Sequence, residues 1–178
     1  MKNLIFYTFI VSMIMNPNFC NADLPQQERL NMSIPQVGSK APDFPGLKEN
    51  KGKNIVLYFY PKDDTPGCTV EACALRDSYH DIGKLNTVIF GVSPDSAKSH
   101  DKFVNKFQLP FPLIPDEDKK ICQAYGVWVE KSMYGKKYMG VARTTFIIDK
   151  NGNIAKVFEK VKPEGHNHEV IEALKALK

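Results

Sequence analysis

Cysteine is scarce in this chain, which has four cysteines among 178 residues. Small exported domains that rely on disulfides for stability carry many cysteines at regular spacing. Here only Cys68 and Cys73 are close together, while Cys20 and Cys122 stand apart. The sequence therefore excludes a disulfide-stapled scaffold and suggests that at least one thiol is present for its reactivity or as a small buried side chain.

Motifs for organic cofactors and metals are also missing. The chain has no glycine-rich phosphate loop and no dinucleotide fingerprint, so no bound cofactor is predicted. His166 and His168 are two residues apart and do not share a helix face, while His80 and His100 are isolated, so we predict no metal site. The net charge of +4 comes from scattered basic residues without interleaved aromatics, which argues against a nucleic-acid partner.

Long apolar runs are absent as well, apart from residues 4–15 (LIFYTFIVSMIM). This run is short for a membrane span and has the length of the apolar region of a signal peptide. We predict cleavage after Ala22, which divides the chain into a signal peptide (1–22), a polar segment (23–36) and a folded domain (37–178). After cleavage we expect no stable membrane association. An uncleaved anchor or an N-terminal helix is the alternative.

The rest of the chain alternates buried strands with helices. Continuous apolar runs at residues 55–60, 86–92 and 111–114 predict strands, and residues 144–148 and 154–158 predict a hairpin around Asn151-Gly152. Helices are predicted at four places: 65–82, 96–107, 116–125 and 164–177. This order predicts an α/β domain with a central mixed sheet flanked by helices on both faces.

Cys68 occupies the position that favours a reactive thiol. The thiolate is the nucleophile, and an ordinary thiol is mostly protonated at neutral pH. Thr65 and Pro66 predict that a helix begins here, so Cys68 falls in the first turn, where free N–H groups and the helix dipole favour an anion. The hydroxyl of Thr65 can donate to the sulfur or to an approaching oxygen, and Pro61 can wall the site from water.

Several motifs together give the chain a specific resemblance. They are APDF at 41–44, YFYPKDDTPGCTVEAC at 58–73, GVSPDS at 91–96, YGVW at 125–128 with the EKSMYGKKYMG that follows, and RTTFIID at 143–149. With them the chain resembles the peroxiredoxins, and among these the peroxiredoxin Q group, also called bacterioferritin comigratory protein. The resemblance runs from about Val37 to the end of the chain.

The resemblance implies a thioredoxin-like fold and the reduction of hydrogen peroxide and organic hydroperoxides. Carried onto this chain, it makes Cys68 the nucleophile, Pro61 and Thr65 the rest of its motif, and Arg143 the arginine that completes the site. It also implies that Cys73 resolves the oxidised Cys68 as an intramolecular disulfide, which a thioredoxin-like dithiol protein reduces. A monomer is expected, and with the signal peptide a bacterial periplasmic location. Whether Glu71 holds Arg143 by an ion pair is left open.

The spacing of Cys68 and Cys73 has a mechanical consequence. Five residues of α-helix place two Cα atoms roughly 8–9 Å apart, whereas a disulfide tolerates at most about 7 Å. Such a bond therefore requires the helix to unwind. Cys122 is the rival resolving residue, although a buried, inert thiol is the preferred interpretation.

Two alternatives to a peroxidase remain open from the sequence. One is a nonenzymatic redox sensor or chaperone-like protein. The other is a general thiol–disulfide oxidoreductase, which is disfavoured because such enzymes use a Cys-x-x-Cys motif and this chain has CTVEAC.

Overall fold

The main sheet of the protein has five strands in the order β3-β2-β1-β6-β7. The computed structural model describes residues 33–133 and 135–177. The strands of this sheet are β1 (Asn54–Phe59), β2 (Thr87–Ser93), β3 (Leu113–Pro115), β6 (Thr144–Ile148) and β7 (Ile154–Glu159). β1 pairs in parallel with β2 and antiparallel with β6, so the predicted mixed sheet is confirmed.

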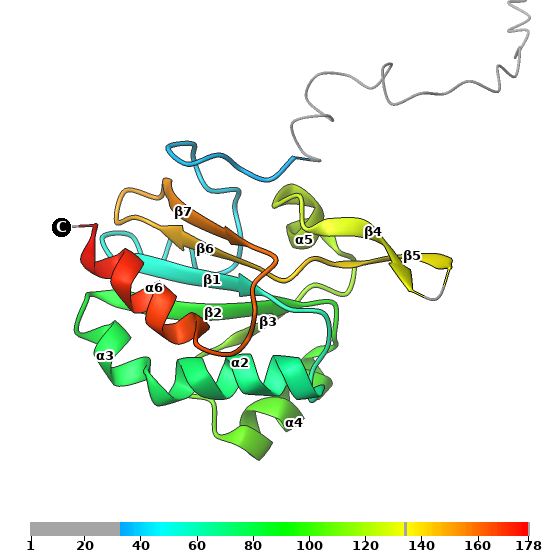
Figure 1. Ribbon diagram of the computed structural model, residues 1–178. Helices are drawn as coiled ribbons and strands as arrows, with labels where there is room; N and C mark the ends of the chain where they lie inside the picture. Colours follow the sequence, from blue (N-terminus) through cyan, green and yellow to red (C-terminus); the bar gives the residue numbers. More distant parts are fainter. Residues whose placement is uncertain (1–32, 134, 178) are drawn as a thin grey trace, which may run out of the picture.

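The helices lie on both faces of this sheet (Figure 1). They are α2 (Pro66–Asp77), α3 (Tyr79–Gly83), α4 (Ala97–Phe107), α5 (Lys120–Ala124) and α6 (His166–Lys175). Four of them, α2, α3, α4 and α6, pack on one face in a core that includes Val56 and Tyr58 of β1. The other face is covered by α5 and by N-terminal residues such as Phe44, in a core that includes Ile55 and Leu57. This alternation along β1 is what a strand buried on both sides requires.

Two predicted helices differ from the observed ones. The helix predicted over 65–82 breaks at Ser78, which ends α2 and precedes α3. The helix predicted over 116–125 is shorter, because Lys119 has a left-handed backbone (φ 62°) and α5 begins after it. Asp116 lies outside α5 and accepts hydrogen bonds from the N–H groups of Ile121 and Cys122.

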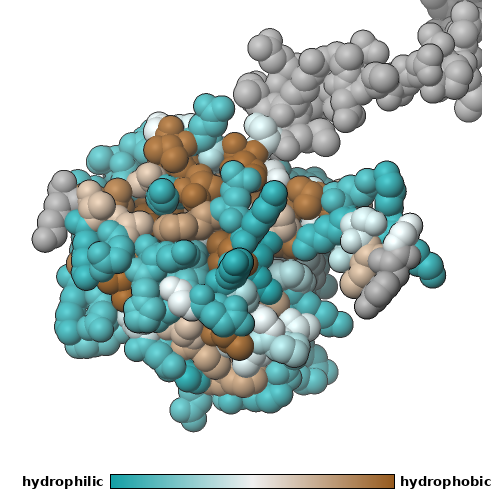
Figure 2. All heavy atoms as spheres, viewed as in Figure 1, coloured by the Kyte–Doolittle hydropathy of each residue, from teal (hydrophilic) through white to brown (hydrophobic). Residues whose placement is uncertain are grey.

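A second sheet was missed by the sequence analysis. It is a hairpin of β4 (Trp128–Met133) and β5 (Lys136–Val141), which projects from the body of the molecule (Figure 1). Most of its side chains are exposed, including the large apolar side chains of Met133, Tyr138 and Met139. Elsewhere the face seen in Figure 2 is mostly hydrophilic, with smaller apolar areas between.

The hairpin of β6 and β7 follows the prediction. Gly152 takes a positive φ of 78° in the connecting turn. The Asp149 carboxylate accepts hydrogen bonds from the N–H groups of Asn151 and Asn153, which closes the turn. On its other edge β6 pairs antiparallel with β1, and this pairing brings Thr144 at the start of β6 next to Phe59 at the end of β1.

Candidate active site

Cys68 lies in the first turn of α2, at the end of the sheet where β1 terminates. Thr65 is the N-cap with an extended backbone (φ −96°, ψ 151°), and Pro66 is the first helical residue, as predicted. In the described structure the N–H groups of Gly67 and Cys68 have no hydrogen-bond acceptor, as expected at a helix N-terminus. Cys68 is only 2% exposed, so little water competes at its sulfur, and its place in the first turn puts it near the positive end of the helix dipole.

Arg143 contacts the sulfur from the other side. Its Nη2 donates to Cys68 Sγ at 3.4 Å, and its Nη1 donates to a carboxylate oxygen of Glu71, one turn further along α2. Arg143 directly precedes β6, and Thr144 pairs with Phe59 at the end of β1. The topology of the sheet therefore brings together two residues that are 75 positions apart in the sequence. The ion pair between Glu71 and Arg143, which the sequence left open, is present.

Gly67 provides room for the guanidinium. A Cβ atom at this position would lie 3.4 Å from Nη2 of Arg143, closer than most Cβ contacts. A side chain at this position would touch the guanidinium, which could adjust only by a small shift. The glycine in the sequence PGC therefore leaves room for the close approach of Arg143 to the first turn of α2.

Burial shapes the electrostatics of this cluster. Burial raises the pKa of Glu71 to about 7, although the charge and hydrogen bond of Arg143 act in the opposite direction. Burial lowers the pKa of Arg143, but Glu71 and Cys68 outweigh it and the net shift is upward, so the guanidinium stays charged. The Glu71 side chain is fully buried, while that of Arg143 is 16% exposed. A permanent cation is thus held against the sulfur by a carboxylate that titrates near neutral pH.

Thr65 and Pro61 occupy the loop before Cys68. The Thr65 hydroxyl donates to the Lys62 carbonyl at 3.0 Å and is oriented by it, so in this state it does not donate to the sulfur. Pro61 is exposed at the point where β1 ends. The predicted roles of the Thr65 hydroxyl towards a peroxide and of Pro61 as a wall remain predictions.

The other two described cysteines lie in different surroundings. Cys73 is half-buried in α2 together with Cys68, and neither thiol is in a disulfide. Cys122 is fully buried in the core on the opposite face of the sheet from Cys68. The sheet therefore separates Cys122 from the sulfur of Cys68 while the fold is intact.

A buried polar pair next to the site was missed from the sequence. Asp63, in the loop before Cys68, accepts a hydrogen bond from His100 of α4, which the sequence analysis treated as isolated. His100 falls on the same face of α4 as the buried Phe103, and a histidine among apolar positions needs a polar partner. That pattern is the one sequence signal that could have revealed the pair.

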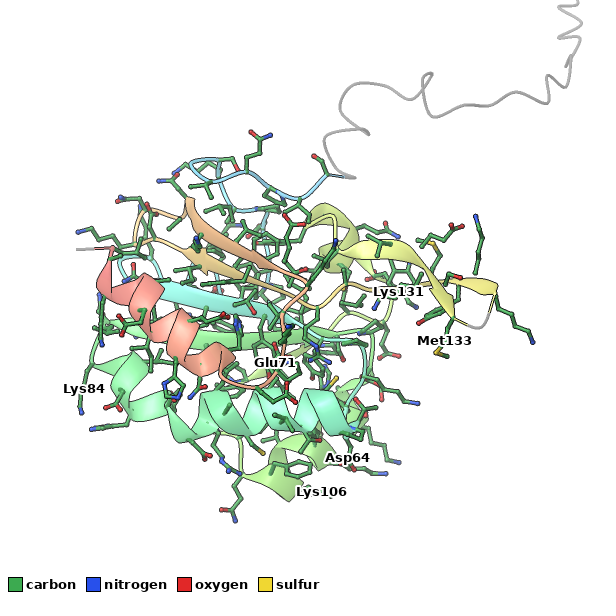
Figure 3. All side chains as sticks on the ribbon, in the orientation of Figure 1. Asp64, Glu71, Lys84, Lys106, Lys131 and Met133 are labelled. Atoms are coloured by element: carbon green, nitrogen blue, oxygen red, sulfur yellow. The ribbon has the colours of Figure 1, made fainter. Side chains whose placement is uncertain are left out.

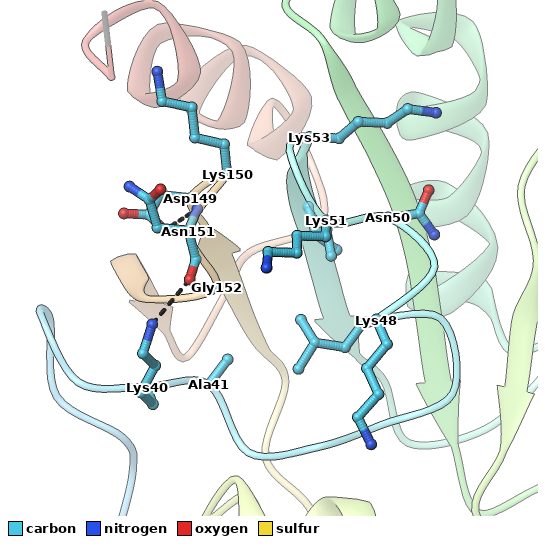
Figure 4. A pocket seen from close by; sticks show the side chains of 12 residues that line it. Lys40, Ala41, Lys48, Asn50, Lys51, Lys53, Asp149, Lys150, Asn151 and Gly152 are labelled. Carbon is cyan, nitrogen blue, oxygen red and sulfur yellow. Dashed lines mark hydrogen bonds between the residues drawn. The ribbon is translucent and has the colours of Figure 1, made fainter.

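A separate hollow of about 210 Å³ lies at the opposite end of β1 (Figure 4). Several lysines rim it, and Lys40 donates to the Asn151 carbonyl across it at 3.0 Å. It contains no thiol. Within residues 33–133 and 135–177, no group of three His, Cys, Asp or Glu side chains is placed to hold a metal ion.

The predicted signal peptide (1–22) lies outside the described residues, as does most of the polar segment. None of the helices in the described part of the chain has both the length and the apolar character needed to cross a membrane.

Comparisons with known proteins identify the family of this chain. Residues 37–157 match the AhpC/TSA family. The chain is 48% identical to peroxiredoxin Bcp of Bacillus subtilis over 149 residues, which cover 79% of this chain and 95% of that protein.

Solved structures give the same result. A mutant of PrxQ from Xylella fastidiosa superposes with a TM-score of 0.77 at 34% identity, covering 82% of this chain and 98% of that one. The bacterioferritin comigratory protein of Xanthomonas campestris superposes with a TM-score of 0.70 at 42% identity, covering 73% and 83% of the two chains. These likenesses confirm the thioredoxin-like fold. This chain therefore belongs to the AhpC/TSA family, as a thiol-dependent peroxide reductase of the Bcp/PrxQ group of peroxiredoxins.

Proposed function

We propose that the protein reduces hydrogen peroxide and organic hydroperoxides, alkyl hydroperoxides among them, with Cys68 as the nucleophile. One observation carries this proposal: a thiol in the first turn of a helix with Nη2 of Arg143 at 3.4 Å from its sulfur. The similar Xanthomonas campestris protein has alkyl peroxide reduction activity, which supports the substrate class.

In the first step the Cys68 thiolate attacks the terminal, protonated oxygen of the hydroperoxide. The S–O bond forms as the O–O bond breaks, and the leaving alkoxide takes a proton to become an alcohol, or water in the case of hydrogen peroxide. Sulfur is oxidised to a sulfenic acid while the peroxide is reduced. Arg143 and the free amides at the start of α2 are placed to stabilise the negative charge that spreads over sulfur and oxygen.

In the second step we propose that Cys73 attacks the sulfenic sulfur and releases water, which leaves a Cys68–Cys73 disulfide. Both residues belong to α2, where their Cα atoms are roughly 8–9 Å apart by helix geometry. Because a disulfide tolerates at most about 7 Å, the first turns of α2 must unwind. Cys122 is disfavoured as the resolving residue because it lies across the sheet.

The cycle closes when a dithiol protein of the thioredoxin type reduces the disulfide. Resolution within one chain needs no second subunit, so we propose a monomer. We also propose export to the bacterial periplasm through the N-terminal segment, where a reducing relay must then be present.

A peroxidase assay with a dithiol reductant tests the proposal. We expect wild type and Cys122→Ser to turn over, Cys68→Ser to be inactive, and Cys73→Ser to react once without efficient turnover. Peptide mapping of the peroxide-treated protein should show a Cys68–Cys73 bridge. A Cys68–Cys122 bridge as the main product would refute the proposed resolution step.

A further inference from the structure

A buried ion pair fixes the loop that leads into the active-site helix. Nδ1 of His100 lies 2.9 Å and 3.2 Å from the two carboxylate oxygens of Asp63, and both side chains are only 4% exposed. The Tyr60 hydroxyl donates to the same carboxylate at 2.7 Å. Asp63 lies two residues before Thr65 and five before Cys68, so this cluster sets where α2 begins.

The backbone of the same residue is held as well. The N–H of Asp63 donates to Oδ2 of Asp95 at 2.8 Å, and the Ser93 hydroxyl donates to that oxygen at 2.7 Å. The main chain of Asp63 is therefore anchored to the segment that joins β2 to α4, and its side chain is anchored to α4 itself through His100. The next residue, Asp64, takes a left-handed backbone (φ 52°), so the chain turns sharply directly after the anchor.

The far end of α2 is held by the same neighbouring helix. Nη1 of Arg76 donates to the carbonyl of Phe107, the last residue of α4, at 2.8 Å. An exposed ion pair between Lys106 and Asp64 adds a contact at the amino-terminal end, where Figure 3 shows the two side chains next to each other. α4 thus holds both ends of the segment that contains Cys68 and Cys73.

Stability alone does not account for a buried pair at this place. A buried ion pair loses much of its attraction to desolvation, and an apolar pair of similar size is often as stable. In the described structure Nε2 of His100 is also buried, next to the Ile114 carbonyl but without a hydrogen bond of good geometry to it, which adds a cost. What the pair provides is a fixed position for residue 63 next to a helix that has to open and close.

We propose that the Asp63–His100 pair is a positioning device that holds the first turn of α2 in the geometry for peroxide attack. It also forms the fixed end from which that turn unwinds for resolution. The second part rests on the proposed function, whereas the first part does not depend on which residue resolves Cys68.

The two chemical steps then respond in opposite directions when the pair is lost. Attack on peroxide needs the folded turn, because Arg143 and the amides act only from that geometry. Formation of the disulfide needs the unwound turn. A looser anchor should therefore slow sulfenic acid formation and leave disulfide formation as fast as before or faster.

The pair also predicts a pH dependence. Burial lowers the pKa of His100, but the hydrogen bond and charge of Asp63 outweigh it, and the net shift is upward from 6.5. The groups that face His100 are Asp63, the more distant carboxylate of Asp95 and the Tyr60 ring. Because the folded-state pKa is raised, the pair stabilises the loop fully below pH 6.5, and this contribution is lost as the pH rises through the folded-state value.

Rapid-quench mass spectrometry of the full protein after one equivalent of peroxide measures the two steps separately. In His100→Leu we expect sulfenic acid formation to slow about tenfold, the size of one partly lost positioning contact, and disulfide formation not to slow. His100→Asn keeps a donor near the position of Nδ1, so its rate of sulfenic acid formation should stay close to that of wild type at neutral pH. Because an amide does not titrate in this range, the variant should not show the decline at alkaline pH that we expect for wild type. Lys84→Met is the control that removes an exposed ion pair, with Asp81, that has no part in holding this loop, and it should leave both steps unchanged.

The proposal would be overturned if His100→Leu formed the sulfenic acid as fast as wild type, or if sulfenic acid formation and disulfide formation slowed equally in it. It would also be overturned if His100→Asn lost as much of the rate of sulfenic acid formation as His100→Leu. If His100→Leu fails to fold, Asp63→Asn, which keeps the side-chain shape, takes its place with the same expected rates. Failure of the proposed function is seen separately. In that case wild type forms no Cys68–Cys73 disulfide, while the effect of the His100 variants on sulfenic acid formation is still measured.

Discussion

Cys68 and Cys122 are both buried, yet their surroundings are of opposite electrostatic sign. Cys68 lies at the start of α2 with the Arg143 guanidinium on its sulfur. Cys122 lies in α5, where Oδ2 of Asp116 accepts a hydrogen bond from its backbone N–H at 2.8 Å. Burial and the Asp116 carboxylate raise the pKa of the Cys122 thiol well above its ordinary value. The sign of the nearest charge, and not exposure, therefore distinguishes the proposed nucleophile Cys68 from Cys122.

The sharpest test of this contrast is to exchange each sulfur for oxygen. Cys68→Ser should abolish peroxide consumption, since no other thiol in the described residues accepts a hydrogen bond from a cation. Cys122→Ser should retain most of the wild-type rate, because the substituted side chain stays in the core across the sheet. Peroxide consumption under excess dithiol reductant measures both. Loss of activity in Cys122→Ser, with the fold intact by circular dichroism, would contradict the proposed contrast between Cys68 and Cys122.

Removal of the Arg143 guanidinium should have the next largest effect on the rate of peroxide attack. Arg143→Met should slow the peroxide step by about 10²–10³-fold, the range for loss of one charge-stabilising donor. Arg143→Lys should recover only part of this, because a single ammonium cannot bind Glu71 and the sulfur in the same fork geometry. Stopped-flow kinetics measure the rate constant for peroxide attack.

Lys137→Met is the control for loss of a positive charge. Lys137 forms an exposed ion pair with Glu130 on the hairpin. We expect its replacement to leave the peroxide step unchanged. A similar loss in both variants would show that net charge, rather than the contact with Cys68, controls the rate.

Glu71→Gln should have a smaller effect that depends on pH. The wild-type carboxyl, whose pKa burial raises to about 7, takes up a proton as the pH falls and then no longer holds Arg143 as an ion pair. We expect the wild-type rate of peroxide attack to fall through this range. The variant should be about tenfold slower above pH 7 and lack this transition.

The contribution of Glu71 to the free energy of unfolding should change with pH in the opposite direction to its effect on the rate of peroxide attack. Because its folded-state pKa is raised from 4.5, the folded state holds the proton more tightly than the unfolded chain does. This group therefore favours folding as the pH falls from 7 to 4.5, and the gain is lost as the pH rises. Urea denaturation of wild type and Glu71→Gln across that range measures it. Parallel pH profiles of the two proteins would contradict the assignment.

The smallest effect on catalysis is expected at Asp116. Asp116→Ala removes the acceptor for two backbone N–H groups at the start of α5 and should lower the free energy of unfolding by about 1–2 kcal/mol. The rate of peroxide attack by Cys68 should not change. A large catalytic loss in a folded variant would mean that the two faces of the sheet are coupled.

Much of the fold was predictable because its central strands β1, β2 and β6 are buried on both sides and are continuous apolar runs in the sequence. The break at Ser78 and the short α5 were not, since both depend on local backbone turns that helix propensity does not show. The hairpin of β4 and β5 was missed because its exposed strands lack an alternating apolar pattern. Helix propensity and apolar periodicity thus give the core, but not the parts that project from it.

The site was predictable where its residues are adjacent in the sequence. Thr65, Pro66 and Cys68 fall where the helix-start pattern placed them. Arg143 came only from the family resemblance, because the pairing of β1 with β6 is what brings it to the sulfur. The link between Asp63 and His100 spans 37 residues and depends on the packing of α4, so no local pattern contains it.

The central claim is that peroxide reacts at Cys68 and not at the equally buried Cys122. The most direct test treats Cys73→Ser, which cannot complete the proposed disulfide, with one equivalent of peroxide and a sulfenic acid trapping reagent. We predict that peptide mapping finds the adduct on the peptide containing Cys68, and that its yield collapses in the Arg143→Met background. An adduct mainly on Cys122, or a Cys68 adduct that forms equally fast without Arg143, would contradict the account.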